Sequence, residues 1–128
     1  MPKKFELTDL QLDILSVLWG RGPASAADVT EALHKRRKLA NTTIATMLAR
    51  LEKKGVVTHT VHGRVYLYRA AVTEEQVRGS MLSRVAAAFR GDVAAIVNQL
   101  LDRDLDADEI ARVRKLVDER ARKLKEKK

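Results

Sequence analysis

The apolar repeat of this 128-residue chain changes its period at Gly55. Before that glycine, in the stretch "ANTTIATMLARLEKKG", apolar residues recur at three- and four-residue steps and predict a helix: Ile44, Met47, Leu48 and Leu51. After it, "VVTHTV" and "RVYLYRA" are rich in β-branched and aromatic residues, with His62-Gly63 between them as a tight turn. The sequence therefore predicts a helix that is followed at once by a β-hairpin.

Two further helices are expected upstream. Thr8 and Gln11 form the pattern of a capping box, an apolar stripe follows, and Gly20 is expected to end the helix. Ser25 resembles a second N-cap, for a short helix that ends near "HKRRK" at 34–38, and Asn41 is expected to cap the third helix. Three helices followed by a hairpin is the order of a winged helix-turn-helix, in which the third helix enters the DNA major groove.

Basic residues outnumber acidic ones, mostly in the first part of the chain. The net charge is +8; residues 1–72 hold 12 Lys and Arg against 6 Asp and Glu, or +6, and residues 73–128 hold 13 against 11, or +2. A positive excess on a mixed surface favours a polyanionic partner, and beside the helix and hairpin order it indicates duplex DNA.

The outer face of the third helix is suited to DNA. A helical wheel places Thr42, Thr46 and Lys53 opposite the apolar stripe, with Thr43 and Arg50 on one flank. Threonine hydroxyls contact phosphates or base edges, and Arg50 suits either a bidentate contact to guanine or a phosphate clamp. We expect residues 42–54 to lie in the major groove and the wing, residues 56–70, to lie on the DNA backbone. The alternative to DNA contact is a purely structural interpretation, in which the threonines are tolerated in the first turn of the helix and Arg50 is a solvated charge.

From Thr73 onward three more helices are predicted, capped by Thr73, Asp92 and Asp106. They carry more apolar surface than so short a segment can bury, so we expect a second copy of the chain to cover it. The expected fold is mainly α with a β-hairpin wing, with a DNA-binding domain at 1–72 and a helical dimerisation domain at 73–128. The expected dimer residues are Val77, Met81, Val85, Phe89, Ile96, Val97, Leu100, Ile110, Val113, Val117 and Leu124.

Other signals exclude several function classes. The chain has no cysteine, and its histidines at 59 and 62 should face different ways, so neither a metal site nor a cofactor is expected. The sequence contains no nucleophile paired with a base and no phosphate-binding glycine loop, so an enzyme is not expected. "HKRRK" is either a phosphate-binding patch or a solvated helix end, and Trp19 is expected to be a core or domain-contact residue. No run suits a membrane span or a signal peptide, so a cytoplasmic protein is expected.

Several stretches carry a family resemblance: "LTDLQLDILSVLW", "NTTIATMLARLEKKGVV", "HGRVYLYRAAVTEEQ" and "DLDADEIARVRKLV". Together they resemble the BlaI/MecI penicillinase-repressor family, which also has copper-responsive relatives. The resemblance implies a homodimeric repressor on a palindromic operator, with DNA contacts from Thr42, Thr43, Thr46 and Arg50. It also implies a wing that carries His62 and Arg64. The cysteine cluster of the copper-responsive members is absent.

The resemblance also implies a route of induction. In the penicillinase repressors a membrane sensor-protease pathway leads to cleavage of the dimer helices at an Asn-Phe bond, and this chain has Asn98-Gln99 at the matching position. Either a sensor with another preference cuts near Asn98, or the protein responds to something else, and the two residues are equally well explained as the polar face of a helix. A link to antibiotic resistance and the inducing signal stay open. The alternatives to a repressor are a winged-helix protein-interaction module and a small-ligand-responsive regulator.

Overall fold

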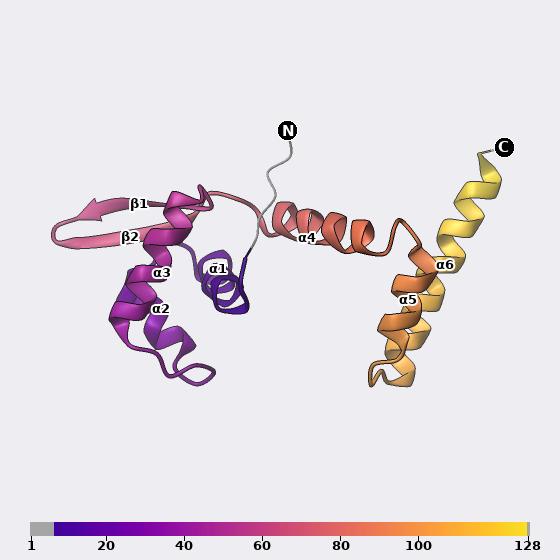
Figure 1. Ribbon diagram of the computed structural model, residues 1–128, viewed down its shortest axis with the longest axis horizontal. Helices are drawn as coiled ribbons and strands as arrows, with labels where there is room; N and C mark the ends of the chain where they lie inside the picture. The colour runs from indigo at the N-terminus through magenta and orange to yellow at the C-terminus, as the bar shows by residue number, and fades with distance from the viewer. Residues whose placement is uncertain (1–6, 128) are drawn as a thin grey trace. The chain divides into compact units, whose positions relative to one another are not determined.

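The computed structural model describes residues 7–127 as six helices and two strands. The elements are α1 (Asp9–Arg21), α2 (Ala26–Leu33), α3 (Asn41–Lys53), β1 (Val57–His62), β2 (Val65–Ala70), α4 (Glu74–Ala88), α5 (Val93–Leu101) and α6 (Ala107–Glu126). The predicted mainly helical fold with a two-stranded antiparallel hairpin is confirmed (Figure 1). The chain divides into two compact units, Met1–Arg84 and Val85–Lys128, so the division falls inside α4, after the expected boundary at residue 72.

The first two helices begin at the predicted caps. Thr8 and Gln11 form a complete capping box at α1, and Ser25 and Asp28 form another at α2. Hydrogen bonds from the backbone and the side chain of Ser25 hold the pKa of the Asp28 carboxyl below its usual value. These local contacts satisfy backbone N–H groups that have no partner inside the helix.

Three local predictions were wrong. Gly20 lies inside α1, which continues to Arg21 and has Gly22, with its φ of 91°, as its C-cap. Asn41 is the first residue of α3 and not its cap; the N-cap is Ala40, which has no side chain able to accept a hydrogen bond. The Asn41 side-chain oxygen lies 3.1 Å from Oγ1 of Thr30 in α2, whose single hydroxyl hydrogen also reaches the Ala26 carbonyl oxygen at 2.8 Å, so the Asn41 side chain is turned toward α2. The hairpin turn is Gly63-Arg64, because His62 pairs with Val65 in the strand ladder, and Gly63 takes the positive φ of 65° that such a turn needs.

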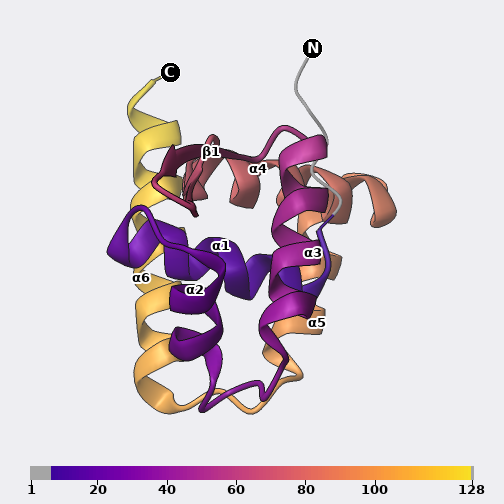
Figure 2. The same cartoon turned by 90° about the vertical axis from the view of Figure 1, so that its left-hand side faces the viewer.

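A buried core joins the three helices to the hairpin. Figure 2 shows α1 lying across α2 and α3. The Ala24 backbone exchanges two hydrogen bonds with Tyr68, so a single-residue β-bridge joins the α1–α2 connection to β2. The largest fully buried side chains of this core are Ile14, Leu15, Ile44, Leu48, Leu51, Val29, Val56, Val57 and Val77.

The core extends past residue 72. Thr73 and Gln76 exchange hydrogen bonds at the start of α4, as predicted, and Val77 on its first turns is only 1% exposed among the core residues of the first unit. The assignment of Val77 to a dimer interface is therefore wrong, because its own chain already covers this side chain. Trp19 packs against the same core and donates its indole N–H to the Val72 carbonyl oxygen at 2.9 Å, which confirms it as a core-contact residue.

The second unit contains two helices that bury little. Asp92 and Asp106 cap α5 and α6 as predicted, by accepting hydrogen bonds from the Ala95 and Glu109 backbone N–H groups. Neither helix contains a fully buried residue. Large apolar side chains of these two helices stay exposed, namely Val93, Leu100, Leu101, Ile110, Val113, Leu116, Val117 and Leu124.

Candidate nucleic-acid interface

The outward face of α3 is polar, small and basic. Ile44, Leu48 and Leu51 are fully buried on one side of the helix. The five predicted contact residues of this helix are exposed: Thr42, Thr43, Thr46, Arg50 and Lys53. The exposed alanines at 45 and 49 add no bulk between them. This face therefore allows close approach and offers hydroxyl and cationic groups, which is what a duplex groove requires.

The hydroxyl of Thr46 already donates a hydrogen bond within α3. The Thr46 hydroxyl donates to the Thr42 carbonyl oxygen at 3.0 Å. Its lone pairs and its methyl group remain directed outward, so in this conformation Thr46 is an acceptor and an apolar contact. An amino group on a base edge, such as that of adenine or cytosine, would complement it.

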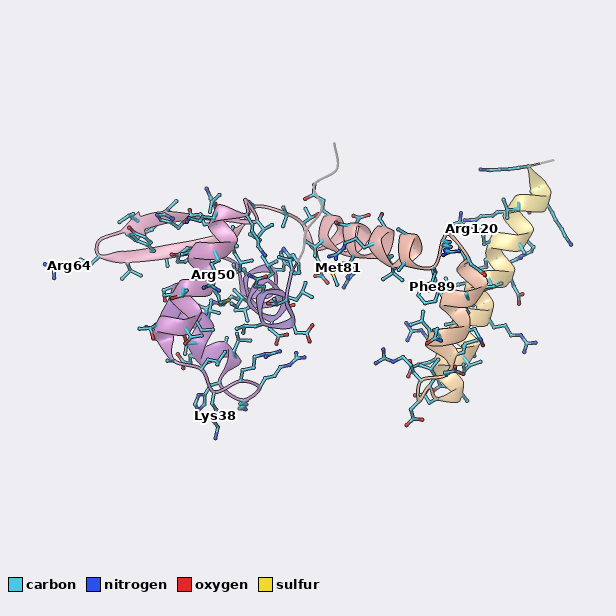
Figure 3. All side chains as sticks on the ribbon, in the orientation of Figure 1. Lys38, Arg50, Arg64, Met81, Phe89 and Arg120 are labelled. Atoms are coloured by element: carbon cyan, nitrogen blue, oxygen red, sulfur yellow. The ribbon has the colours of Figure 1, made fainter. Side chains whose placement is uncertain are left out.

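Basic side chains near the end of α3 differ in what they contact. Lys54 directs its ammonium group to Oε1 of Gln11 at 3.3 Å, a side chain that is buried among core residues. Lys53, one residue earlier, is exposed on the outer face. Arg50 is exposed on α3 as well and is marked in Figure 3. The cationic groups available to a ligand on this face are therefore Arg50 and Lys53, while Lys54 also supports the core.

The wing supplies a third cationic group. Arg64 occupies the turn and lies at the tip of the hairpin (Figure 3). His62, at the end of β1, is exposed, and strand alternation places it on the face opposite His59, as predicted from the spacing. Both predicted wing residues are thus accessible to a phosphate backbone.

The structure also reveals a cluster that the sequence analysis did not predict. Nδ1 of His59 lies 2.7 Å from Oε2 and 2.8 Å from Oε1 of Glu52, which joins β1 to the last turn of α3. Because a carboxylate only accepts hydrogen bonds, Nδ1 carries the donated proton. The His59 ring stacks on Tyr66 with centroids 4.2 Å apart and planes 10° apart, and Tyr68 tilts against both rings.

Tyr68 forms the inner end of this cluster. Burial, followed by the charge of Glu52, raises the pKa of the Tyr68 phenol. The strand register pairs His59 with Tyr68, so alternation along two strands joined by a two-residue turn was the signal available in the sequence. Strand alternation does not predict how the hairpin packs against α3, so the contact of His59 with Glu52 could not be predicted.

The basic stretch at 34–38 divides into anchored and free groups. Nε of Arg37 donates to Oδ2 of Asp13 at 2.6 Å, and Nη1 of Arg36 lies 3.4 Å from Oδ1 of the same carboxylate, whose side chain is only 12% exposed. His34, Lys35 and Lys38 are exposed, and Figure 3 marks Lys38 at this loop. Two of the arginines thus tie the loop before α3 to α1, and the remaining basic groups face solvent.

The predicted dimer residues outside the first unit's core lie on accessible or half-buried faces. Phe89, Ile96 and Val97 are half-buried. The others are exposed: Met81, Val85, Leu100, Ile110, Val113, Val117 and Leu124. Asn98 and Gln99 are exposed in α5, and the Asn98 carbonyl oxygen accepts a hydrogen bond from the Asp102 backbone, so this peptide bond is helical.

Residues 7–127 contain no cluster of three or more His, Cys, Asp or Glu side chains that could hold a metal ion. Within the same range, no helix combines the length and the apolar character needed to cross a membrane. Within the first unit, the exposed face of α3, the wing and the loop before α3 carry basic side chains.

Residues 7–119 match the family described as penicillinase repressor. The chain is 30% identical to the penicillinase repressor of Bacillus licheniformis over 131 residues, which cover 98% of this chain and all of the relative. It also resembles two solution structures at 33% identity, each covering 59% of this chain and 93% of the other. One is the DNA-binding domain of the repressor BlaI, with a TM-score of 0.52. The other is the monomeric form of Bacillus licheniformis BlaI in complex with the blaP half-operator, with a TM-score of 0.50.

Proposed function

Because this chain belongs to the penicillinase-repressor family, we propose that it is a homodimeric transcriptional repressor that binds a palindromic operator in duplex DNA. The observation that carries this proposal is the exposed face of α3, which presents Thr42, Thr43, Thr46, Arg50 and Lys53. A structure at 33% identity, which has been solved with a half-operator, supports it. The protein acts by binding rather than by catalysis, and we place it in the cytoplasm, where a bacterial chromosome lies.

In this proposal α3 enters the major groove and the hairpin follows the backbone. Arg50 is the candidate for a bidentate contact to guanine, and the threonines read adjacent base edges or phosphates. His62 and Arg64 contact phosphates from the wing, and Lys53 does so from the end of α3. The ion pairs of Asp13 with Arg36 and Arg37 support this role, because they fix the loop from which α3 begins.

The second unit supplies the dimer. Its helices leave apolar stripes uncovered in a single chain, and Val113 and Val117 of α6 remain 39% and 59% exposed. A second copy would remove this surface from water at about 25 cal/mol per Å² of apolar area. Two linked DNA-binding units then occupy two half-sites about 10 bp apart, or a multiple of that distance. Linkage raises the affinity for the whole operator above that for either half.

Relief of repression by cleavage near Asn98 is part of the proposal. A cut in α5 would separate the DNA-binding unit from α6 and so remove much of the apolar dimer surface. The monomers that result would hold only one half-site each. The signal for this cut would come from a membrane sensor-protease pathway.

Footprinting on DNA upstream of its own gene tests the function. We expect protection of two related half-sites and a logarithm of affinity that falls linearly with the logarithm of salt concentration. Each phosphate contact contributes about 0.9 to the magnitude of this slope, so the slope measures the number of contacts. A protein that protects no sequence and shows no salt-dependent affinity for duplex DNA would instead be a winged-helix protein-interaction module.

A further inference from the structure

The cluster of Glu52, His59 and Tyr66 joins the two DNA-facing elements and has no role in the function proposed above. Glu52 belongs to α3, His59 to β1 and Tyr66 to β2. The His59–Glu52 bond fixes the imidazole to the helix, and the imidazole in turn supports one face of the Tyr66 ring. The contacts therefore run without interruption from α3 to the outer half of the wing.

This cluster lies on the face of the hairpin that turns toward α3. Strand alternation puts His59, Tyr66 and Tyr68 on one face, and the base of that face is buried, with Tyr68 only 7% exposed. Toward the tip the same face becomes open. Tyr66 and its cross-strand partner Val61 are 50% and 58% exposed. An aromatic ring with one face stacked and its edge in solvent is placed to meet a partner outside the chain.

The position of Glu52 shows where that partner would lie. Glu52 is on the flank of α3, between the buried stripe that ends at Leu51 and the outer face that includes Ala49 and Lys53. A ligand that covers the outer face of α3 and reaches this flank therefore comes next to the cluster that holds the half-exposed Tyr66 ring. For a duplex with α3 in its major groove, the neighbouring surface is the sugar-phosphate backbone.

We propose that the Tyr66 hydroxyl donates a hydrogen bond to a phosphate oxygen of the operator, and that His59 and Glu52 are positioning residues that hold the Tyr66 ring for this contact. The inference rests on the proposed function, because its ligand is the same DNA. The stack and the Glu52 bond order the ring before binding, so less side-chain freedom is lost when the complex forms.

Tyr66→Phe is the sharpest variant, because it removes the hydroxyl and keeps the stacked ring. A hydrogen bond to a charged group is strong enough that we expect about tenfold weaker binding for each half-site. The salt slope should stay unchanged, since a hydroxyl displaces no counterion, whereas Arg64→Ala should lower it by about one for each half-site. Ser16→Ala is the matched control, because it removes an exposed hydroxyl from α1, outside α3 and the wing, and its affinity should equal that of the wild type.

The positioning role has its own test in a double-mutant cycle. His59→Ala should weaken operator binding, and adding Tyr66→Phe to it should then cost less than twofold, because the ring is no longer held. His59→Asn keeps an N–H donor at the position of Nδ1 for Glu52 and should restore at least part of the affinity. Thermal unfolding of each variant separates these effects from a loss of folding: a melting temperature equal to that of the wild type is expected for Tyr66→Phe.

The outcomes distinguish the inference from the proposed function. Wild-type protein that binds its operator while Tyr66→Phe changes affinity by less than twofold, or while Ser16→Ala weakens binding equally, overturns the inference alone. Independent, additive effects of His59→Ala and Tyr66→Phe overturn the positioning role. Wild-type protein that binds no duplex overturns the proposed function and this inference with it.

Discussion

At the scale of single residues, α3 separates the roles of its side chains by position on one helix. Ile44, Leu48 and Leu51 hold it to the core, while Arg50 is free to contact a ligand because it lies on the flank of the outer face. The helical period of the apolar residues was sufficient to predict this separation. It did not predict that Thr46 would donate its hydrogen to the Thr42 carbonyl, since rotamers depend on the folded backbone.

Arg50→Ala tests the reading of bases by this face. We expect operator affinity to fall by about 1–3 kcal/mol, with relaxed preference at one base pair if Arg50 contacts guanine. Quantitative mobility shifts on the operator and on single-base variants measure both effects. Arg103→Ala is the control, since it removes the same charge from an exposed position in the second unit. Unchanged affinity for Arg50→Ala would remove this residue from the site.

At the scale of elements, local sequence signals predicted where most helices start but not which contacts join them. The caps at Thr8, Ser25, Asp92 and Asp106 require only residues three positions apart, and all are present. The Asn41 cap failed because α3 begins one residue earlier, after Ala40, and the Asn41 side chain lies beside Thr30 of α2, a contact that depends on tertiary structure. The same limit applies to the His59–Glu52 bond, which joins two elements whose relative placement follows from core packing.

The boundary between units shows this limit most clearly. The apolar period of α4 gave no reason to separate Val77 from Met81 and Val85, since all three fit one stripe. In the structure Val77 completes the core of the first unit, whereas Met81 and Val85 remain exposed. A continuous stripe can therefore serve two surfaces, one within the chain and one available to a second copy.

Trp19→Phe tests the contact that joins α1 to the segment after the wing. The change keeps most of the ring in its packing site but removes the hydrogen bond to the Val72 carbonyl, leaving that acceptor without its protein donor. We expect a loss of about 1 kcal/mol of unfolding free energy, which lowers the melting temperature by about 4–8 °C for a domain of this size. Calorimetry on the full chain measures it. Melting that matches the wild type would show that water replaces the indole without cost.

Val113→Asp with Val117→Asp tests the dimer surface of α6. Placing two carboxylates in an apolar contact leaves buried charges without partners, so we expect monomers that bind the operator poorly. Sedimentation gives the mass, and mobility shifts give the affinity. Ala111→Asp serves as the control, because Ala111 lies beside Arg114, Lys115 and Arg122 on the charged side of the helix. An intact dimer in the double variant would place the interface elsewhere.

At the scale of the whole molecule, the two units divide the proposed work of repression. The first unit holds a buried core and the elements that we propose contact DNA, while the second exposes the apolar surface that a second copy would cover. The distribution of charge along the sequence agrees with this division, because most of the positive excess falls in residues 1–72. Affinity for a full operator then depends on the link between the units, and an event that disconnects α6 would lower it without changing α3.

The bond between Asn98 and Gln99 is where such an event is expected. It lies in the last turns of α5, so the helix must open locally before a protease can bind it as an extended segment. Residues of α5 are not buried within one chain, which lowers the cost of that opening in a monomer. A protease pocket shaped for an aromatic side chain after asparagine would lose about 1–3 kcal/mol of binding when it meets polar Gln99.

We therefore expect cleavage here only by a protease whose preference differs from an Asn-Phe bond. Cleavage is measured by immunoblot, which gives the size of the protein in its native cell before and after challenge with a cell-wall antibiotic. An N-terminal fragment ending near Asn98 that appears as the repressed genes are expressed is the expected result. Asn98→Ala with Gln99→Ala keeps an exposed helical site and should abolish both the fragment and induction, because the side chains that the protease recognises are gone. Full-length protein throughout derepression would contradict cleavage and assign induction to a bound ligand or to dilution of the repressor.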